Sequence, residues 1–164
     1  MPSISPTTES IADVLARDGL HAALELLNAR TPFRFTGVYR FDGDMLRNVA
    51  LFDRAAPMCP RGSDAPLGET YCAITGKLND ALLVSDGRRD PRHPWMRGNS
   101  VVSYCGVPIR SESGEAIGTL CHFDDKPCQS QGREATFLMC IADSFAPWVT
   151  ANDGPLALRG TTAI

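Results

Sequence analysis

The sequence predicts an α+β domain built on a central antiparallel β-sheet, with helices from both ends of the chain on one face and loops over the other. Three observations support this fold class. Amphipathic helical segments stand near both ends of the chain, and the segments of alternating polarity between them are short and arranged as hairpins. Glycine and proline, at 14 and 12 of 164 residues, supply the many turns that such an arrangement needs.

The first helical segment covers residues 10–30. Its apolar residues recur at helical spacing and form a stripe that covers a core: Ile11, Val14, Leu15, Leu20, Ala23, Leu24 and Leu27. Gly19, near the middle, predicts a break or a bend because glycine disfavours helix interiors. Thr31-Pro32 then stops the helix. The same apolar stripe also offers a surface for a homodimer.

A β-hairpin follows at residues 33–53, with its turn at Asp42-Gly43-Asp44, where glycine tolerates a positive φ. Strand alternation places an apolar set on one face of the first strand: Phe33, Phe35, Gly37, Tyr39 and Phe41. The opposite face is mixed and carries Arg34, Thr36, Val38 and Arg40. One apolar and one mixed face is the pattern expected of a sheet that packs on helices on one side.

The middle of the chain alternates loops with short regular elements. Residues 54–66 are rich in proline and glycine, which predicts a loop. Residues 67–77 predict a short helix, which begins near the end of that loop and is closed by Gly76. A strand at residues 81–86 and a second long loop at residues 87–100 come next.

A second hairpin spans residues 103–124 and holds two cysteines. If Glu112-Ser113-Gly114 is a three-residue turn with its glycine left-handed, the ladder places Cys105 opposite Cys121, with Cα atoms about 4.5–5.5 Å apart. The two thiols are then either a redox pair or small buried apolar groups. A register shift of one residue abolishes the facing pair.

Strand alternation also separates Tyr104 from Cys105, so that one of them faces the helices and the other a pocket. The sequence does not decide which. A final helix covers residues 130–149, and Pro147 is expected to kink or end it.

The composition of the chain limits the classes of function that we expect for it. A hydrophobic content of 43%, a charged content of 21% and a net charge of −3 are typical of a globular protein, and no basic run suggests a nucleic-acid partner. No stretch approaches the roughly 18 apolar residues of a membrane span, and the N-terminus does not resemble a signal peptide, so we expect a cytoplasmic protein with no membrane partner. Its six cysteines contain no C-x-x-C pair, which argues against a metal site and favours free thiols.

Domain organisation follows from length and from the extent of these patterns. We expect a single domain at residues 9–150, a flexible N-terminus at residues 1–8 and a loosely ordered tail at residues 151–164.

Four motifs, taken together, resemble the GAF domain family. They occur in the family's order and at its distances: "LGETYCAITGK" (67–77), "LLVSDGRRDPR" (82–92), "SYCGVPI" (103–109) and "GEAIGTLCHFDDKP" (114–127). The resemblance covers roughly residues 20–150. It implies a GAF/PAS-like fold with a small-molecule pocket under the loops, opposite the terminal helices. It also implies a sensory role, exerted on a separate signalling partner or across a homodimer, because no effector domain follows in this sequence.

Nine residues are the candidates for ligand binding in such a pocket: Tyr71, Cys72, Thr75, Asp86, Trp95, Tyr104, Cys105, Thr119 and Cys121. The tyrosine and threonine hydroxyls among apolar walls match the composition of small-molecule sites. Asp86 is a candidate either for a ligand or for capping the turn before Gly87. Trp95 lies in the loop expected over the pocket, and four nearby arginines would suit an anionic ligand. The sequence identifies neither the ligand, which is a small molecule or an ion, nor a cofactor.

An enzymatic alternative comes from a more distant resemblance to the free methionine-R-sulfoxide reductases, which are stand-alone GAF proteins. "LGETYCAITG" resembles that family's glycine-rich helix start, and Cys72 matches a cysteine position there, which implies a nucleophilic or resolving thiol. This chain has no cysteine in the loop where that family has another, so Cys105 or Cys121 would have to supply it. A third interpretation is a redox sensor that uses Cys105 and Cys121.

Overall fold

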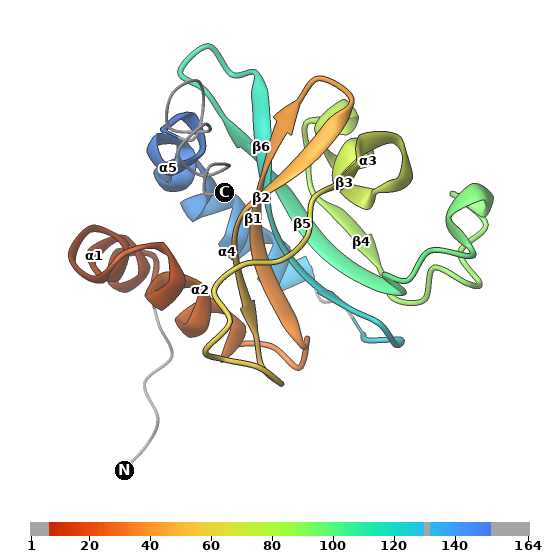
Figure 1. Cartoon of the computed structure of the whole chain (residues 1–164), viewed down its shortest axis with the longest axis horizontal. Coiled ribbons are helices and arrows are strands. Elements are labelled where there is room, and N and C mark those ends of the chain that lie inside the picture. Colours follow the sequence, from red (N-terminus) through yellow and green to blue (C-terminus); the bar gives the residue numbers. More distant parts are fainter. Residues whose placement is uncertain (1–6, 130–131, 152–164) are drawn as a thin grey trace.

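The computed structural model describes residues 7–129 and 132–151 as a sheet with helices on both sides (Figure 1). The predicted tails, residues 1–8 and 151–164, lie almost entirely outside the described residues. The elements are, in chain order, α1 (Thr8–Asp18), α2 (Leu20–Asn28), β1 (Phe35–Asp42), β2 (Met45–Asp53), β3 (Ala65–Pro66), the 3-10 turn η1 (Leu67–Glu69), α3 (Tyr71–Leu78), β4 (Leu82–Val84), η2 (Pro94–Met96), β5 (Ser103–Arg110), β6 (Ala116–Asp124), α4 (Gly132–Ile141), η3 (Ala142–Phe145) and α5 (Ala146–Thr150).

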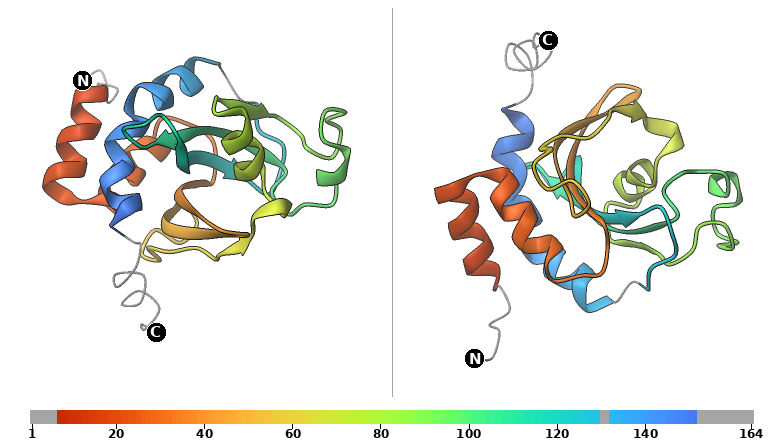
Figure 2. Two further views of the ribbon diagram at one scale, coloured as in Figure 1. Left: turned by 90° about the horizontal axis from the view of Figure 1, so that it is seen from above. Right: turned by 60° about the horizontal axis from the view of Figure 1, so that its bottom comes forward.

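The six strands form one antiparallel sheet in the order β3-β2-β1-β6-β5-β4. Helices from the two ends of the chain, α1, α2, α4 and α5, cover one face, whereas α3 and the long loops lie over the other (Figures 1 and 2). The predicted α+β fold class is confirmed. No helix of the described part of the chain is long and apolar enough to cross a membrane.

Two clusters of buried side chains lie on the two faces of the sheet. The first, here called the helix-side core, includes Leu24, Leu27, Val38, Cys105, Val107, Leu120, Leu138 and Phe145. The second, here called the cavity-side cluster, consists of Tyr39, Leu46, Tyr71, Cys72, Leu82, Val84, Met96, Tyr104 and Cys121. Strand alternation accounts for this division, because neighbouring residues of β5 and of β6 fall into different clusters.

The helix boundaries confirm one sequence prediction and correct another. Gly19 separates α1 from α2 with a φ of 94°, as its position in the apolar stripe predicted. Gly76 does not close α3, which continues to Leu78 and ends at Asn79 in the left-handed conformation. A Cβ at Gly76 would lie 2.7 Å from the ring of Phe41, so this glycine allows α3 to pack closely on the sheet.

The ladder between β5 and β6 corrects the predicted cysteine pair. The turn forms as expected, with Gly114 at a φ of 86° and Ser111 N donating to Glu115 O at 2.9 Å. A bulge next to Ile109 then shifts the register by one residue, so that Cys105 pairs with His122 and Cys121 pairs with Gly106. Cys105 and Cys121 therefore lie on opposite faces of the sheet and cannot form the predicted switch.

The predicted final helix consists of three pieces. It changes from α4 to the 3-10 segment η3 after Ile141, and α5 begins just before Pro147. Proline cannot donate the backbone hydrogen bond of a helix interior, so the break falls immediately ahead of it.

Candidate functional site

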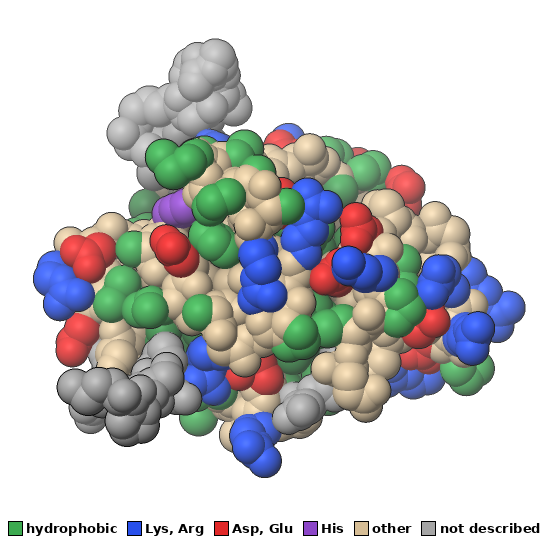
Figure 3. Space-filling view, turned by 90° about the horizontal axis from the view of Figure 1, so that it is seen from below, with side chains coloured by type: hydrophobic (Ala, Val, Ile, Leu, Met, Phe, Trp, Pro, Cys, Tyr) green, Lys and Arg blue, Asp and Glu red, His purple; other side chains and the backbone are tan. Residues whose placement is uncertain are grey.

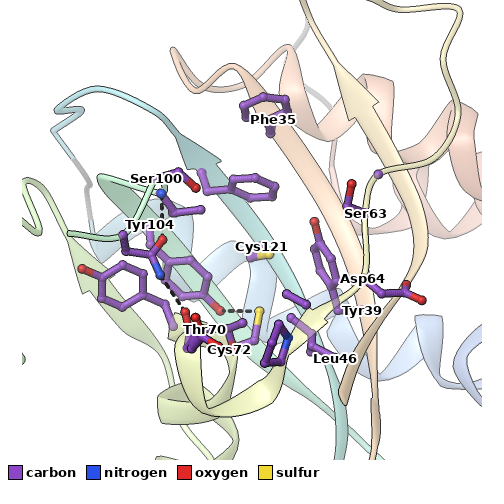
Figure 4. A pocket seen from close by; sticks show the side chains of 18 of the residues that line it. Phe35, Tyr39, Leu46, Ser63, Asp64, Thr70, Cys72, Ser100, Tyr104 and Cys121 are labelled. Carbon is purple, nitrogen blue, oxygen red and sulfur yellow. Dashed lines mark hydrogen bonds between the residues drawn. The ribbon is translucent and has the colours of Figure 1, made fainter. Parts of the chain in front are cut away.

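A cavity of about 660 Å³ lies between the sheet and α3 (Figure 4). Its lining comes from β1, β2, β3, β5 and β6, from η1 and α3, and from the loop segments between them. The residues that line it are Phe35, Tyr39, Leu46, Leu51, Gly62, Ser63, Asp64, Ala65, Pro66, Glu69, Thr70, Tyr71, Cys72, Gly98, Asn99, Ser100, Val101, Tyr104, Cys121 and Phe123. This volume lies within the range of about 300–1,000 Å³ that small-molecule sites occupy.

Aromatic rings form the walls. Phe35 and Phe123 stack with their centroids 4.9 Å apart, and the ring of Tyr39 is tilted against Phe123 at 6.2 Å. Tyr71 and Tyr104 pack against each other at 5.5 Å. Figure 4 shows Tyr39 and Tyr104 on opposite sides of the cavity, each carried there by its strand.

Cys72 lies at the floor of the cavity, at the second residue of α3. Thr70 caps this helix by accepting a hydrogen bond from Ala73 N at 3.2 Å. The Cys72 Sγ accepts hydrogen bonds from Thr119 Oγ1 at 3.0 Å and from Tyr104 OH at 3.5 Å. Thr75 contacts the same tyrosine hydroxyl at 3.0 Å and thereby holds it in place.

These contacts distinguish the two cysteines of the cavity. Burial acts to raise the pKa of Cys72, but hydrogen bonds from Cys121, Thr119 and Tyr104 outweigh it and lower the pKa below its ordinary value. Burial and the hydrogen bond to Cys72 raise the pKa of Cys121 well above its ordinary value. Cys72 is therefore the more acidic of the two cavity thiols.

Cys105 belongs to the other face of the sheet. It is fully buried in the helix-side core, and burial raises its pKa to about 12. A protonated and inaccessible thiol is a poor nucleophile, so Cys105 packs as a small apolar residue.

The other predicted site residues fall into two groups. Thr75 and Thr119 lie directly behind the floor, where they contact Tyr104 and Cys72. Asp86 and Trp95 do not line the cavity: the Asp86 carboxylate accepts hydrogen bonds from the backbone and side chain of Arg88, and Trp95 is 66% exposed and packs edge-on against His93.

Several cavity residues were not predicted, above all Phe35, Tyr39 and Phe123. The signal for the first two was present, because alternation placed them on one apolar face of their strand. That pattern predicts a face that packs on helices. In the structure only Phe33 lies in the helix-side core, whereas Phe35 and Tyr39 line the cavity. The wall at residues 62–66 lies in a segment whose composition indicated only a loop. No group of three or more potential metal ligands occurs within the described residues.

Comparisons with known proteins agree with this architecture. The family model for the GAF domain matches residues 13–147. The structure is similar to the GAF domain of a phosphoenolpyruvate-protein phosphotransferase from Acinetobacter, with 14% sequence identity, a TM-score of 0.69, and coverage of 88% of this chain and 91% of that chain. No curated protein sequence matches the chain.

Two solved reductases share the fold as well. The type II free methionine-R-sulfoxide reductase from Thermoplasma acidophilum is 24% identical, with a TM-score of 0.63 and coverage of 85% of this chain and 94% of that one. The free methionine-R-sulfoxide reductase from Neisseria meningitidis, solved with its substrate, is 20% identical, with a TM-score of 0.63 and coverage of 92% and 93%. At these identities the likeness concerns the fold.

Proposed function

The chain belongs to the GAF domain family, and on that premise we propose that it binds a small molecule in the cavity beneath α3 and acts as a sensor. The cavity is the observation that carries the proposal. It combines a suitable volume, apolar aromatic walls and a few polar groups that converge on one point, which are the features of a small-molecule site.

Strand β6 offers a route for the signal. Cys121 faces the cavity, whereas the neighbouring Leu120 and His122 are fully buried against the terminal helices. A ligand that binds one position of this strand more tightly shifts the population of helix positions on the opposite face. The helices then present a changed surface to a signalling partner or to a second copy of the chain.

Native mass spectrometry tests the binding proposal. The freshly purified protein is expected to carry an extra mass that denaturation removes. Leu46→Trp fills the cavity from its wall, because Leu46 lines it and is 3% exposed, and this variant should lose the extra mass. Met58→Trp, at a site 92% exposed, is the matched control and should keep it. An extra mass retained by the Leu46 variant would place the ligand outside the cavity.

A second candidate function, thiol-dependent reduction of a sulfoxide, is favoured by one specific observation. Cys72 and Cys121 line the same cavity and share a hydrogen bond, with the lowered pKa on Cys72. The Cys72 thiolate would attack the sulfoxide sulfur, and the two thiols together would supply two electrons and two protons. The products are the sulfide, one water and a Cys72–Cys121 disulfide, which an added dithiol reduces again.

Turnover of free methionine sulfoxide in the presence of dithiothreitol tests this second candidate. The wild-type protein and Cys105→Ser should be active, and Cys72→Ser should lose activity. An inactive wild-type protein would refute the reductase function and leave the sensor proposal in place.

A further inference from the structure

The cavity contains no positive charge of its own. Among the described residues that line it, none is lysine, arginine or histidine. The arginines of the 87–100 loop lie outside the lining, where Arg88 pairs with Asp86 at 3.1 Å and Arg92 pairs with Asp90 at 2.6 Å. Figure 3 shows basic and acidic side chains mixed at the end of the molecule where this loop protrudes. The anionic ligand that these arginines suggested would therefore meet no counter-charge in the cavity.

The charged and electron-rich groups of the lining are negative. The carboxylate of Asp64 turns away from the cavity and is balanced by Arg47 at 3.2 Å (Figure 4). Glu69 lies at the exposed rim and forms no ion pair with any residue that the structure describes. At the floor, the Cys72 Sγ receives two hydroxyl donors, an arrangement that favours an anionic acceptor.

The aromatic walls of the cavity also favour a positively charged ligand. Aromatic rings carry a negative potential on their faces and attract a cation that lies within about 6 Å of the ring centre. Rings of Phe35, Tyr39 and Tyr104 lie around the space above Cys72 (Figure 4), and Phe123 lines the same cavity. Phe35 is stacked on Phe123 and also lies 4.6 Å from the guanidinium of Arg34, so Tyr39 and Tyr104 are the rings left to a ligand. A positively charged ligand would interact favourably with these rings, with the floor sulfur and with the rim carboxylate. An anion would lose its hydration without gaining a counter-charge from the residues that line the cavity.

We propose that the cavity selects a small organic cation, an amine or quaternary ammonium attached to an apolar group, over neutral and anionic molecules of the same size. The apolar group fills the space between the rings, and the charged nitrogen lies between the ring faces and Cys72. This inference rests on the proposed function, because it names the class of ligand that the same cavity takes.

A size-matched series of three probes tests the proposal on the full chain: benzylammonium, benzyl alcohol and benzoate. Each is titrated at matched ionic strength near pH 7.5, where the amine is protonated, and binding is followed by amide chemical shifts in ¹H–¹⁵N NMR spectra. We expect benzylammonium to bind about tenfold or more tightly than benzyl alcohol, and benzoate to bind more weakly still. The largest shifts should fall on cavity residues such as Ser100 and Cys121.

Two glutamate variants refine the test. Glu69→Gln removes the rim charge from an exposed position and should lower the affinity for benzylammonium about threefold while leaving benzyl alcohol unchanged. Glu112→Gln, in the exposed turn between β5 and β6, removes the same charge away from the cavity and should change neither affinity.

The alternative outcomes separate the two proposals. If benzyl alcohol or benzoate binds in the cavity as tightly as benzylammonium, the cation preference is wrong and the cavity remains a ligand site. If none of the probes shifts cavity residues at concentrations up to about 10 mM, the proposed function fails as well.

Discussion

The two faces of the sheet differ in how their buried polar side chains are hydrogen-bonded. On the helix side, His122 is fully buried and both of its ring nitrogens have partners, Thr36 Oγ1 at 2.7 Å and Glu134 Oε2 at 2.9 Å. Arg30 completes the group by pairing with Glu134 at 3.0 Å. These polar groups satisfy one another, so this network stabilises the fold rather than binding a ligand.

On the cavity side, the hydrogen bonds converge on one sulfur beside empty space. Thr119 and Tyr104 both donate to Cys72, which borders the cavity. Neighbouring residues of β6 thus belong to different environments, because His122 lies in the closed polar network and Cys121 lines the cavity beside Cys72. The comparison teaches that the function of a thiol in this fold depends on strand parity, since Cys105 and Cys121 differ mainly in the face they occupy.

Truncation of an aromatic ring should show the largest difference in stability between the two faces of the sheet. Phe145→Ala empties a fully buried position of the helix-side core and should lower the free energy of unfolding by about 3–5 kcal/mol. Phe123→Ala removes a half-buried ring beside an existing cavity and should cost about 1–2 kcal/mol, because fewer contacts are lost. Urea denaturation measures both values, and equal losses would contradict the division into two environments.

The reactivity of Cys72 should respond to its donors. Thr119→Val keeps the shape of the side chain but removes a hydrogen bond that lowers the pKa of Cys72. The thiolate fraction falls, so alkylation of Cys72 near pH 7 should slow by about threefold to tenfold. Thr75→Val is the comparison, since Thr75 acts on the sulfur only through Tyr104, and this variant should slow the rate less than Thr119→Val does. Unchanged alkylation in the Thr119 variant would show that the donors do not activate the thiol.

The helix-side network should make the fold sensitive to acid. Burial lowers the pKa of His122 below its ordinary value of 6.5, although Glu134 opposes that shift. Burial raises the pKa of Glu134, but His122 and Arg30 outweigh it, so this pKa is lowered as well. Below about pH 6.5 the unfolded chain therefore binds more protons than the folded one, and the stability falls as the pH falls.

The midpoint of urea denaturation should accordingly decrease steadily between about pH 7 and pH 4. His122→Gln lowers the midpoint overall but removes its change between about pH 7 and pH 5.5, because the titrating ring is gone. A wild-type midpoint that rises on acidification would have the wrong sign for this account.

The smallest effect is expected at the protruding loop. Trp95→Ala removes a side chain that is 66% exposed and does not line the cavity. Both the unfolding free energy, within about 0.5 kcal/mol, and the affinity for benzylammonium should remain unchanged. A loss of binding in this variant would mean that the loop closes over the ligand.

The sequence predicted the fold well because its signals are local. Gly19, Gly43 and Gly114 each marked a break or turn that the structure contains. The register of β5 and β6 was beyond such signals, since the bulge between Ile109 and Arg110 shifts the pairing by one residue while the turn itself forms as expected. The predicted register was wrong by one residue. It therefore placed Cys121 opposite Cys105, whereas Cys121 lines the cavity.

The sequence predicted only part of the candidate site, again because only local signals can be read from it. Tyr71, Cys72, Tyr104 and Cys121 were chosen by residue type and position, and the structure brings them together at the floor of the cavity. Trp95 was chosen because it lies in a long loop, and loop residues have no periodicity that shows which way they point. The aromatic face of β1 was read as a helix-packing surface, since an apolar face has the same pattern whether it meets helices or a ligand.

Competitive alkylation of the native protein tests the difference between the two faces most directly. Limiting iodoacetamide is added near pH 7, and the fraction of each cysteine modified is measured after digestion. The account predicts that Cys72 reacts at least tenfold faster than Cys105, which stays unmodified until the protein unfolds, with exposed Cys59 and Cys140 as internal references. Modification of Cys105 in the folded protein as fast as that of Cys72 would contradict the assignment of the cavity side as the functional face.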